Sequence, residues 1–595
     1  METKLSSLAL LDFASTTSPT IPLLSFLPVL ILCLLLAFIN PTRRVKLPGP
    51  TGLPLVGNLF QLRSGHARAL ARWTNEYGGI FRLALGEREA IVINTYADVN
   101  KTLVQQGAAF QSRPEFKLWH GAFTKALAVD APSTIGTAPF SEEISKYRRL
   151  LAAQTTVAGL KRFNHFTARR CFSLVHLLSK SAKSGIPQDL GFHFWTTAIG
   201  ISVDTFFGRT FEDDVTRLIA DLSIKTFRQR SLGTPIHDHV PLVAAAERLA
   251  LIVATPLHFV LRRLEWASWM DSIYRAEAYA KKLRDVEVGC CTRLLQDLHR
   301  RLDAGDPTPC QMGDILRLNG ALTPNDELRL TTTVFASGMG VGTNLTWLAA
   351  LLAGHPEMQE NAYRAIEEVY GGEVPDPLDT DRVEYIKALG MEAGRYFASI
   401  RLGFPRETYE DVVVDGVLIP KSVLVAYNAY QINRDPQRYD FAEDFLPERW
   451  TDGRYGRTDV KQAKVGVPHL NHGAGRRMCM GVPNVNKMLY ANLVLLLHFF
   501  KLERGPLDDT TIGTVFPAAR AVGEASLSVN PIDDQVSACD PQALPLAAGI
   551  KLTVRDPDAL DRWLADGHRE LDQWEGPSLL DTPSPMFNFK EWTVG

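Results

Sequence analysis

The sequence predicts a mainly α-helical protein with small β-sheets, preceded by one N-terminal transmembrane helix. An uncharged apolar run near the N-terminus indicates the membrane helix. Successive amphipathic segments fill the middle of the chain, and two short pairs of strand-like segments flank them in the sequence. Because we find no internal repeat, low-complexity tract or linker, we expect one large globular domain over residues 55–556.

Composition excludes several classes of protein. The chain has 595 residues, of which 46% are hydrophobic and 22% charged, so general disorder, collagen and a coiled-coil rod are excluded. Lys and Arg number 64 against 66 Asp and Glu, and without a basic excess we expect no nucleic-acid partner. Seven cysteines without a C-x-x-C pair indicate a reducing compartment, in which an important thiol acts alone.

The N-terminus predicts a single membrane anchor. After a short segment of residues 1–20, residues 21–39 carry no charge. At 1.5 Å per residue they would reach about 28 Å, close to the thickness of the hydrocarbon layer. The run has no small-residue cleavage site at its end, so we expect a retained anchor rather than a signal peptide. Three basic residues follow it and only Lys4 precedes it, which places the rest of the chain in the cytosol.

Short signals punctuate the remaining chain. Residues 40–54 are rich in proline and predict a semi-rigid hinge between the membrane and the globular domain. Two strand-like stretches lie between residues 80 and 94, and Asp415-Gly416 between two apolar runs predicts a β-hairpin. Residues 557–595 form a C-terminal extension to which we assign no role, although Ala559–Trp574 has a helical pattern.

One long helix stands out near the middle of the chain. It is expected to begin at Thr323-Pro324, a capping residue followed by proline, and its apolar pattern continues to about Ala353. Such a helix would be a rod of about 45 Å. Three glycines, each costing about 0.5–1 kcal/mol relative to alanine, lie in its middle: Gly338, Gly340 and Gly342. Three interpretations stay open: close packing of another helix, close approach of a flat ligand, or a kink that opens a cavity.

Cys479 is the strongest candidate for chemistry. Glycines lie around it, Arg476-Arg477 precedes it, and an apolar helical stretch follows it. Backbone amides, cationic neighbours and a helix N-terminus all favour the thiolate over the thiol. A thiolate in this setting can serve as a metal ligand.

The segment around Cys479 resembles the haem-binding loop of the cytochrome P450 family, F-x-x-G-x-R-x-C-x-G, with His472 in place of the phenylalanine. Further signatures of the family occur in the expected order: Leu47-Pro48-Gly49-Pro50, His355-Pro356-Glu357, Glu392-Ala393-Gly394-Arg395, Pro405-Arg406 and Phe445–Trp450. The resemblance covers about residues 20–555. It implies the cytochrome P450 fold and haem b with an axial thiolate from Cys479.

A finer resemblance is to fungal membrane-bound enzymes of the phenylacetate-hydroxylase type. It rests on three segments: Leu53–Leu62, Thr134–Thr137 and Arg395-Tyr396-Phe397. This resemblance suggests a small substrate, aromatic or from secondary metabolism, and the residues do not identify it further.

The family resemblance also implies roles for charged residues. Glu392 and Arg395 are expected to form a structural network that Arg449 completes. Arg148, Arg406 and Arg477 are expected to bind the two haem propionates. By position, the substrate side is expected to include residues 111–139, 226–264 and 544–551. Arg476 and Lys487 either belong to a basic docking face for an electron donor or are solvated surface charges.

One family feature is missing. Most members carry an acid and an alcohol in the central helix that relay protons during oxygen activation, but counting back from His355 puts Met339 and Gly340 there. Thr343 is a weak substitute, because its hydroxyl is expected to bond back to its own helix.

The resemblance implies a haem-thiolate monooxygenase that uses O2 and electrons from NADPH. The missing pair leaves open oxidative coupling, ring closure or rearrangement without oxygen insertion, and a third alternative is a non-catalytic haem-binding membrane protein. The expected partners are NADPH-cytochrome P450 reductase, with cytochrome b5 as a further candidate, and a small-molecule substrate. The expected location is the endoplasmic reticulum membrane, with a single span and a cytosolic catalytic domain.

Overall fold

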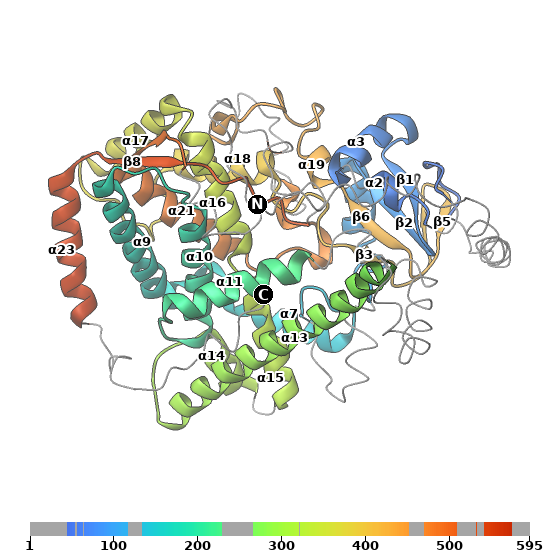
Figure 1. Cartoon of the computed structure of the whole chain (residues 1–595), viewed down its shortest axis with the longest axis horizontal. Coiled ribbons are helices and arrows are strands. Elements are labelled where there is room, and N and C mark those ends of the chain that lie inside the picture. The colour runs from blue at the N-terminus through green and yellow to red at the C-terminus, as the bar shows by residue number, and fades with distance from the viewer. Residues whose placement is uncertain are drawn as a thin grey trace.

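The computed structural model describes residues 45–53, 56–62, 65–116, 134–228, 266–319, 322–451, 469–507, 531 and 541–573. The described part is mainly helical with small sheets, as predicted. Helices fill most of the molecule, and a four-stranded sheet lies at one side of it (Figure 1). The predicted anchor at residues 21–39 and the hinge before residue 45 lie outside the described residues.

The largest sheet has the order β1-β2-β6-β3. Its strands are β1 (Ile80–Leu85), β2 (Arg88–Ile93), β6 (Leu424–Tyr427) and β3 (Arg406–Glu407). β1 and β3 run antiparallel to their neighbours, whereas β2 and β6 are parallel. Alternate residues of β2 enter two separate apolar clusters, one on each face of the sheet. Short helices α2 (Leu59–Leu62) and α3 (His66–Tyr77) supply the cluster on one face.

The predicted hairpin is present. β4 (Val412–Val414) pairs with β5 (Val417–Ile419), and both turn residues have positive φ, 49° at Asp415 and 78° at Gly416. Positive φ at both positions is the geometry of a two-residue turn that matches strand twist. A second pair, β7 (Phe500–Arg504) with β8 (Ile550–Val554), closes the helical side of the molecule.

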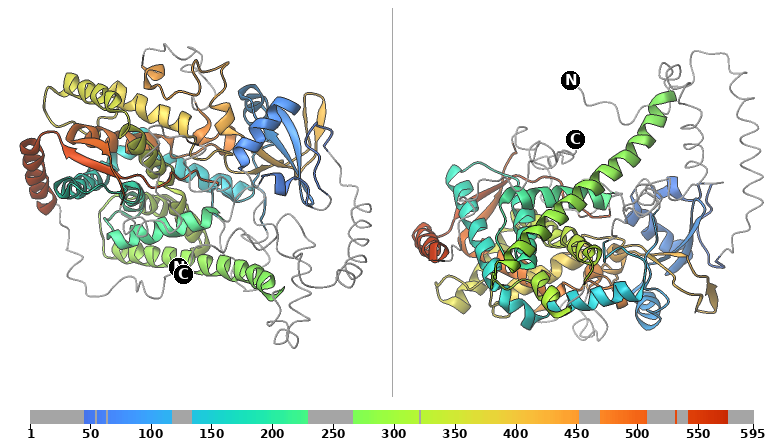
Figure 2. Two further views of the ribbon diagram at one scale, coloured as in Figure 1. Left: turned by 45° about the horizontal axis from the view of Figure 1, so that its top comes forward. Right: turned by 90° about the horizontal axis from the view of Figure 1, so that it is seen from below.

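The helical core is built around α16 (Met339–Leu352), which packs on α10 (Gly191–Phe207), α18 (Glu384–Phe397) and α21 (Val482–Phe499). The remaining helices before it are α4 (Tyr96–Val99), η1 (Asn100–Gln105), α7 (Glu142–Gln154), α8 (Val157–Leu160), η2 (Lys161–Phe163), α9 (Asn164–Ser184), α11 (Asp213–Arg228), α13 (Trp266–Asp303), α14 (Gln311–Asn319), α15 (Pro324–Thr331) and η4 (Thr332–Ala336). Those after it are α17 (Pro356–Tyr370), α19 (Ala429–Ile432), η5 (Pro447–Trp450), η6 (Leu470–His472), η7 (Gly475–Arg477) and α23 (Pro557–Gln573). The long helix α13 extends past its neighbours in the second view of Figure 2.

The central helix is not one straight rod, and the kink that was left open as one interpretation is present. It begins as predicted, with Thr323 capping α15 (Pro324–Thr331) through a capping box. A tight 3-10 segment, η4 (Thr332–Ala336), follows, and the helix then breaks at Ser337, which is extended, and Gly338, which has φ of 80°. The run Pro324–Leu352 is long and apolar enough to cross a membrane, but 78% of its most apolar window is buried inside the protein. The run therefore belongs to the core of the described structure.

Each of the three glycines has a different environment. A Cβ at Gly338 would lie 2.6 Å from the carbonyl oxygen of Ala198, and one at Gly342 would lie 2.8 Å from the Cα of Trp195. Both positions therefore serve the close packing of α10 on this helix, and Gly338 also forms the kink. A Cβ at Gly340 would meet nothing within 4 Å. This glycine is the one that leaves open space beside the helix.

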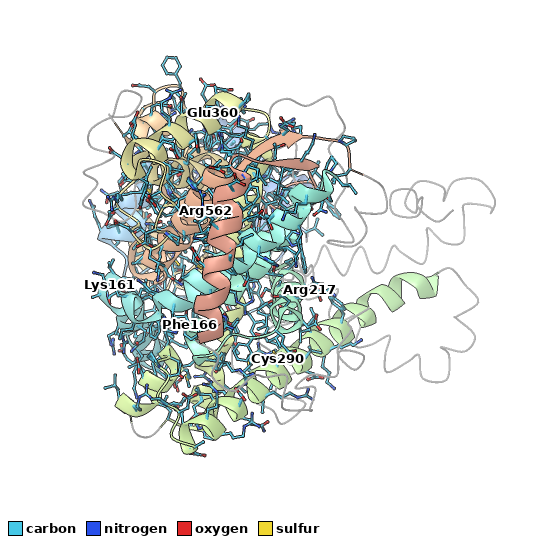
Figure 3. The ribbon with its side chains drawn as sticks, turned by 90° about the vertical axis from the view of Figure 1, so that its left-hand side faces the viewer. Lys161, Phe166, Arg217, Cys290, Glu360 and Arg562 are labelled. Carbon is cyan, nitrogen blue, oxygen red and sulfur yellow. The ribbon has the colours of Figure 1, made fainter. Side chains whose placement is uncertain are left out.

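The start of the C-terminal extension is ordered on the body of the protein. α23 lies along α9 at the edge of the molecule, as Figure 3 shows with Arg562 on its outer surface. The ring centroid of its Trp563 lies 5.1 Å from those of both Phe172 and Phe499. A Cβ at Gly567 would lie 2.2 Å from the Phe172 ring, so this helix packs tightly there.

Candidate active site

The cysteine loop is shaped by two close backbone approaches. The amide of Cys479 donates to the carbonyl of His472 at 2.9 Å, and that of Met478 donates to Gly475 at 3.0 Å. Gly475 has φ of 59°, and a Cβ there would lie 1.8 Å from the carbonyl oxygen of Leu103. Only glycine fits this position without rearrangement. The loop therefore presents Cys479 just before α21 begins at Val482.

The Cys479 side chain lines a cavity, and the open space of that cavity leaves it accessible although many protein atoms surround it. The groups around the thiol have opposite effects on its pKa. Burial in the protein raises the pKa of the thiol, while a hydrogen bond from the amide of Gly481 and the charge of Arg148 act to lower it. The predicted stabilisation of the thiolate by amides and arginine is present, but burial outweighs it in the protein alone. A cation bound to the sulfur would reverse this balance.

Four arginines gather around the same cavity: the buried Arg113, Arg406 and Arg477, and the partly buried Arg148. Backbone carbonyls orient them. Arg148 donates to Met478 at 2.9 Å, Arg477 donates to Ala138 at 3.0 Å, and Arg406 donates to Ala474. In the described part of the chain, none of the four pairs with a carboxylate, and Arg406 Nε and Nη1 and Arg477 Nε have no hydrogen-bond partner.

The pKa values of these arginines reflect the accumulation of positive charge. Burial, together with the neighbouring charges of Arg148 and Arg406, lowers the pKa of Arg477 to about 9. Burial likewise lowers the pKa of Arg406 to about 10, and that of Arg113 falls well below its ordinary value. A cluster of buried cations without an acid is costly unless an anion binds to it.

This cluster fits haem. Two propionates would supply the missing negative charges, and the unpartnered guanidinium nitrogens of Arg406 and Arg477 offer donors to them. Within the described residues, no group of three His, Cys, Asp or Glu side chains could hold a metal ion. A single accessible thiol instead suits a metal that brings its other ligands with it, as haem iron does.

The predicted charge network around Glu392 is present and closed. Arg395 binds both carboxylate oxygens, at 2.8 and 2.7 Å, and Arg449 binds one of them at 3.1 Å. Trp450 and the amide of Leu446 also donate to this carboxylate, each at 2.8 Å. Although burial lowers the pKa of Arg395, the carboxylate raises it above its ordinary value. The indole of Trp450 is a member that sequence analysis missed.

Asn433 connects this network to the cysteine loop. Its carbonyl accepts from Arg395 at 3.0 Å, and its side-chain oxygen accepts from the amide of Leu470 at 2.9 Å. A Cβ at Gly394 would lie 2.6 Å from the ring of His469, so the glycine in this helix makes room for the loop. The network and the loop therefore pack as one unit.

The central helix forms one wall of the cavity around Gly340. Gln542, from the C-terminal part of the chain, reaches this wall and donates to Thr343 Oγ1 at 2.6 Å and to the Met339 carbonyl at 3.2 Å. Thr343 is fully buried and does not line the cavity, and its hydroxyl bonds to Gln542 rather than to its own helix. Gln542 is thus the polar group that stands between Thr343 and the cavity.

Two expectations about the surroundings need correction. Lys487 is 9% exposed and donates to Asn164 at 2.7 Å, so it cannot belong to a docking face, whereas Arg476 is exposed. Thr134, Gly136, Thr226 and Phe227 line the cavity within the predicted walls. The C-terminal wall is Gln542, and residues 544–551 do not contribute to the described lining.

Arg113 and Gln542 are the main site residues that sequence analysis did not single out. Arg113 is followed by a proline and lies far from Cys479 in the chain, and Gln542 lies in a segment without a strong pattern. The signal in the sequence was an arginine, Arg113, within the predicted wall at residues 111–139.

Comparison with known proteins gives a consistent result. The family model for cytochrome P450 matches residues 47–514. The chain is 28% identical over 475 residues to a 3-hydroxyphenylacetate 6-hydroxylase from Emericella nidulans, covering 78% of this chain and 84% of the relative. It is 26% identical over 552 residues to a phenylacetate 2-hydroxylase from the same organism, covering 90% and 96%.

Similar identity also links the chain to a differently named enzyme. It is 26% identical over 502 residues to a drimenol monooxygenase from Persicaria hydropiper, covering 81% of this chain and 92% of the relative. Identity at this level therefore does not select one substrate. The family itself implies haem held by a cysteine thiolate. Because the family model spans most of the sequence and the cavity has the groups that haem needs, the chain belongs to the cytochrome P450 family.

Proposed function

We propose that this protein is a haem-thiolate monooxygenase that hydroxylates a small aromatic or secondary-metabolite substrate, with Cys479 as the axial ligand. The observation that carries the proposal is an accessible thiol in one cavity with four arginines, none of which pairs with a carboxylate among the described residues. When bound, haem with a thiolate ligand activates O2 for insertion into a substrate bond. Arg113, Arg148, Arg406 and Arg477 would hold its propionates.

The substrate side supports an apolar ligand with an aromatic ring. Phe227 and Phe404 both line the cavity and meet edge to face, with ring centroids 5.2 Å apart. Phe335, Val334 and Met339 from the broken central helix extend the same apolar wall. Aromatic walls of this kind bind flat rings through offset and edge contacts.

Gln542 is proposed to take part in place of the missing acid and alcohol. Both hydrogens of its amide nitrogen are used on Thr343 and Met339, which fixes the plane of the side chain at the cavity wall. Because Gln542 holds the Thr343 oxygen as an acceptor, the hydroxyl proton of Thr343 is directed away from this bond. The carboxamide, fixed in place by Thr343, would position the water that carries protons into the cavity.

Electrons are proposed to come from NADPH through a membrane-bound reductase, with cytochrome b5 as a further donor. Family membership supports this source, and the exposed Arg476 beside the cysteine loop offers a positive charge to an acidic partner. Together with the apolar run at residues 21–39, this supports a single-pass protein of the endoplasmic reticulum membrane with a cytosolic catalytic domain.

Product analysis with isotopically labelled O2 tests the proposal. Full-length protein in membranes with a reductase and NADPH would be given phenylacetate, 3-hydroxyphenylacetate and neutral phenols, with Cys479→Ser as the control. Label in a hydroxylated product is the expected result. Oxidation without label would support coupling or ring closure instead, and absence of any NADPH-dependent turnover would support a non-catalytic haem protein.

A further inference from the structure

The cavity has opposite polarity at two of its walls. The arginines supply unpartnered N–H donors at one wall, as described above. Elsewhere in the lining, three oxygen atoms have no hydrogen-bond partner among the described residues: Glu287 Oε1, Asn344 Oδ1 and Thr333 Oγ1. Such buried, unpartnered atoms cost free energy unless a bound molecule satisfies them.

Glu287 is the strongest of these acceptors. It lies on α13, a helix that the proposed haem chemistry does not use, and its side chain is fully buried. Arg284 holds its other oxygen at 3.3 Å, so the pair is close to neutral while Oε1 stays free. A carboxylate oxygen accepts hydrogen bonds more strongly than a neutral oxygen.

Neighbouring helices contribute apolar side chains and a second polar group to the cavity wall that Glu287 lines. Thr333 comes from η4, and Thr226 and Phe227 come from α11, and all three line the same cavity as Glu287. α11, α13 and η4 therefore build this part of the cavity wall together, although they lie far apart in the sequence. A ligand here would place an apolar body against Phe227 and a polar end at Glu287.

We infer that Glu287 Oε1, with Thr333, binds a neutral hydroxyl group of the substrate, so that the enzyme takes phenols or alcohols with an otherwise apolar body. A hydroxyl supplies the one donor that the free oxygen lacks. A carboxylate substrate would bring a second acceptor to an oxygen that needs a donor, and therefore could not satisfy it. The inference deepens the proposed function and rests on it for the assignment of this cavity to the substrate.

The test compares three ligands that share a butyl chain and a ring: 4-butylphenol, 4-butylanisole and 4-butylbenzoate. Calorimetric titration of the full-length, detergent-solubilised holoenzyme gives each dissociation constant without using the haem spectrum. Wild-type protein is expected to bind the phenol at least about tenfold more tightly than the anisole, because a hydrogen bond to a charged group is lost in the ether. Tighter binding of the benzoate than of the phenol would overturn the inference.

Variants assign the preference to Glu287. In Glu287→Leu, the ratio of the anisole to the phenol dissociation constant is expected to fall about tenfold. Glu287→Gln and Thr333→Val, which preserve shape, are expected to lower the ratio about threefold and serve if the leucine variant does not fold. Glu327→Gln, in a glutamate that binds His299 outside the cavity, is the control and should leave the ratio unchanged.

The two proposals fail in different ways. If both shape-preserving variants keep the wild-type ratio, the inference about Glu287 is overturned whatever the enzyme catalyses. If the same preparations lack the red-shifted carbonyl absorption of a reduced haem-thiolate, the proposed function fails instead. A wild-type ratio near one also overturns the inference.

Discussion

Two clusters of buried arginines in this protein differ in one respect. Around Glu392, the guanidinium groups of Arg395 and Arg449 have a carboxylate between them. Around the cavity, four arginines form no ion pair with a carboxylate among the described residues, and three of their nitrogens have no partner. The first cluster is complete within the chain, and the second is complete only with an anionic ligand.

The difference teaches how to separate a structural charge network from a binding site. Both clusters are mostly buried, and burial lowers the pKa of Arg449 as it does those of Arg406 and Arg477. Only the balance of charge distinguishes them. A buried ion pair is destabilised when one partner is lost, whereas a buried group of like charges is stabilised when a partner arrives.

Breaking the closed cluster should have the largest effect. Glu392→Gln is expected to lower the free energy of unfolding by about 3–5 kcal/mol, because two buried guanidinium groups lose their counter-charge. Chemical denaturation of the full-length protein measures this loss. Glu443→Gln is the matched control, since Glu443 is 77% exposed and pairs with Arg434 at 3.2 Å. A control loss under about 1 kcal/mol is expected, and equal losses in the two variants would contradict the account.

Replacing two glycines of the central helix by alanine tests which of them packs against α10 and which faces the open cavity. Gly342→Ala is expected to cost about 1–3 kcal/mol of stability, because its Cβ would meet the backbone of Trp195. Gly340→Ala meets no atom within 4 Å and is expected to gain roughly 0.5–1 kcal/mol. Denaturation midpoints of the two variants decide between these signs. A loss at Gly340 as large as that at Gly342 would mean that the wall is packed rather than open.

Removing one member of the open cluster should weaken haem binding more than folding. Arg477→Met is expected to raise the rate of haem loss about tenfold, because a propionate loses a buried cationic partner. Transfer of haem to an excess of apomyoglobin measures this rate. Arg438→Met is the control, because Arg438 is buried over the ring of Tyr96 and does not line the cavity. Equal rates in both variants would show that the cluster does not hold the propionates.

Replacing Lys487 is expected to have the smallest effect on stability, and the sign of its pH dependence follows from its pKa. Burial lowers its pKa from 10.5 to about 8, so between these values the unfolded chain binds a proton that the folded protein has lost. Its contribution to stability therefore increases as the pH rises from about 8 towards 10.5. Denaturation at several pH values should show a flatter profile for Lys487→Met. An unchanged profile would mean that the amine remains charged in the folded protein.

Some of this site could be predicted from sequence because its geometry is local. Glu392 and Arg395 are one helical turn apart, and the glycines around Cys479 determine the loop through short backbone contacts. The start of the central helix followed from its capping residue and proline. In each case a few neighbouring residues fix the structure.

The remainder depended on contacts between distant parts of the chain. Gln542 reaches Thr343 across 199 positions, and Arg113 reaches Phe404 across 291. The break at Gly338 arises because α10 leaves no room for a side chain there. The spacing of apolar residues along the helix does not predict such a contact. Lys487 is buried because α9 begins with Asn164 beside it. This contact between distant residues could not be predicted from the sequence either.

The most direct test of the central claim is the carbonyl difference spectrum of purified, reduced full-length protein and its Cys479→Ser variant. The account predicts that wild-type protein contains haem and shows the strongly red-shifted absorption that thiolate ligation gives. The variant should lose that band while retaining the fold, because its hydroxyl is a poor iron ligand. Wild-type protein without the pigment, or a variant with an unchanged band, would contradict the assignment of Cys479.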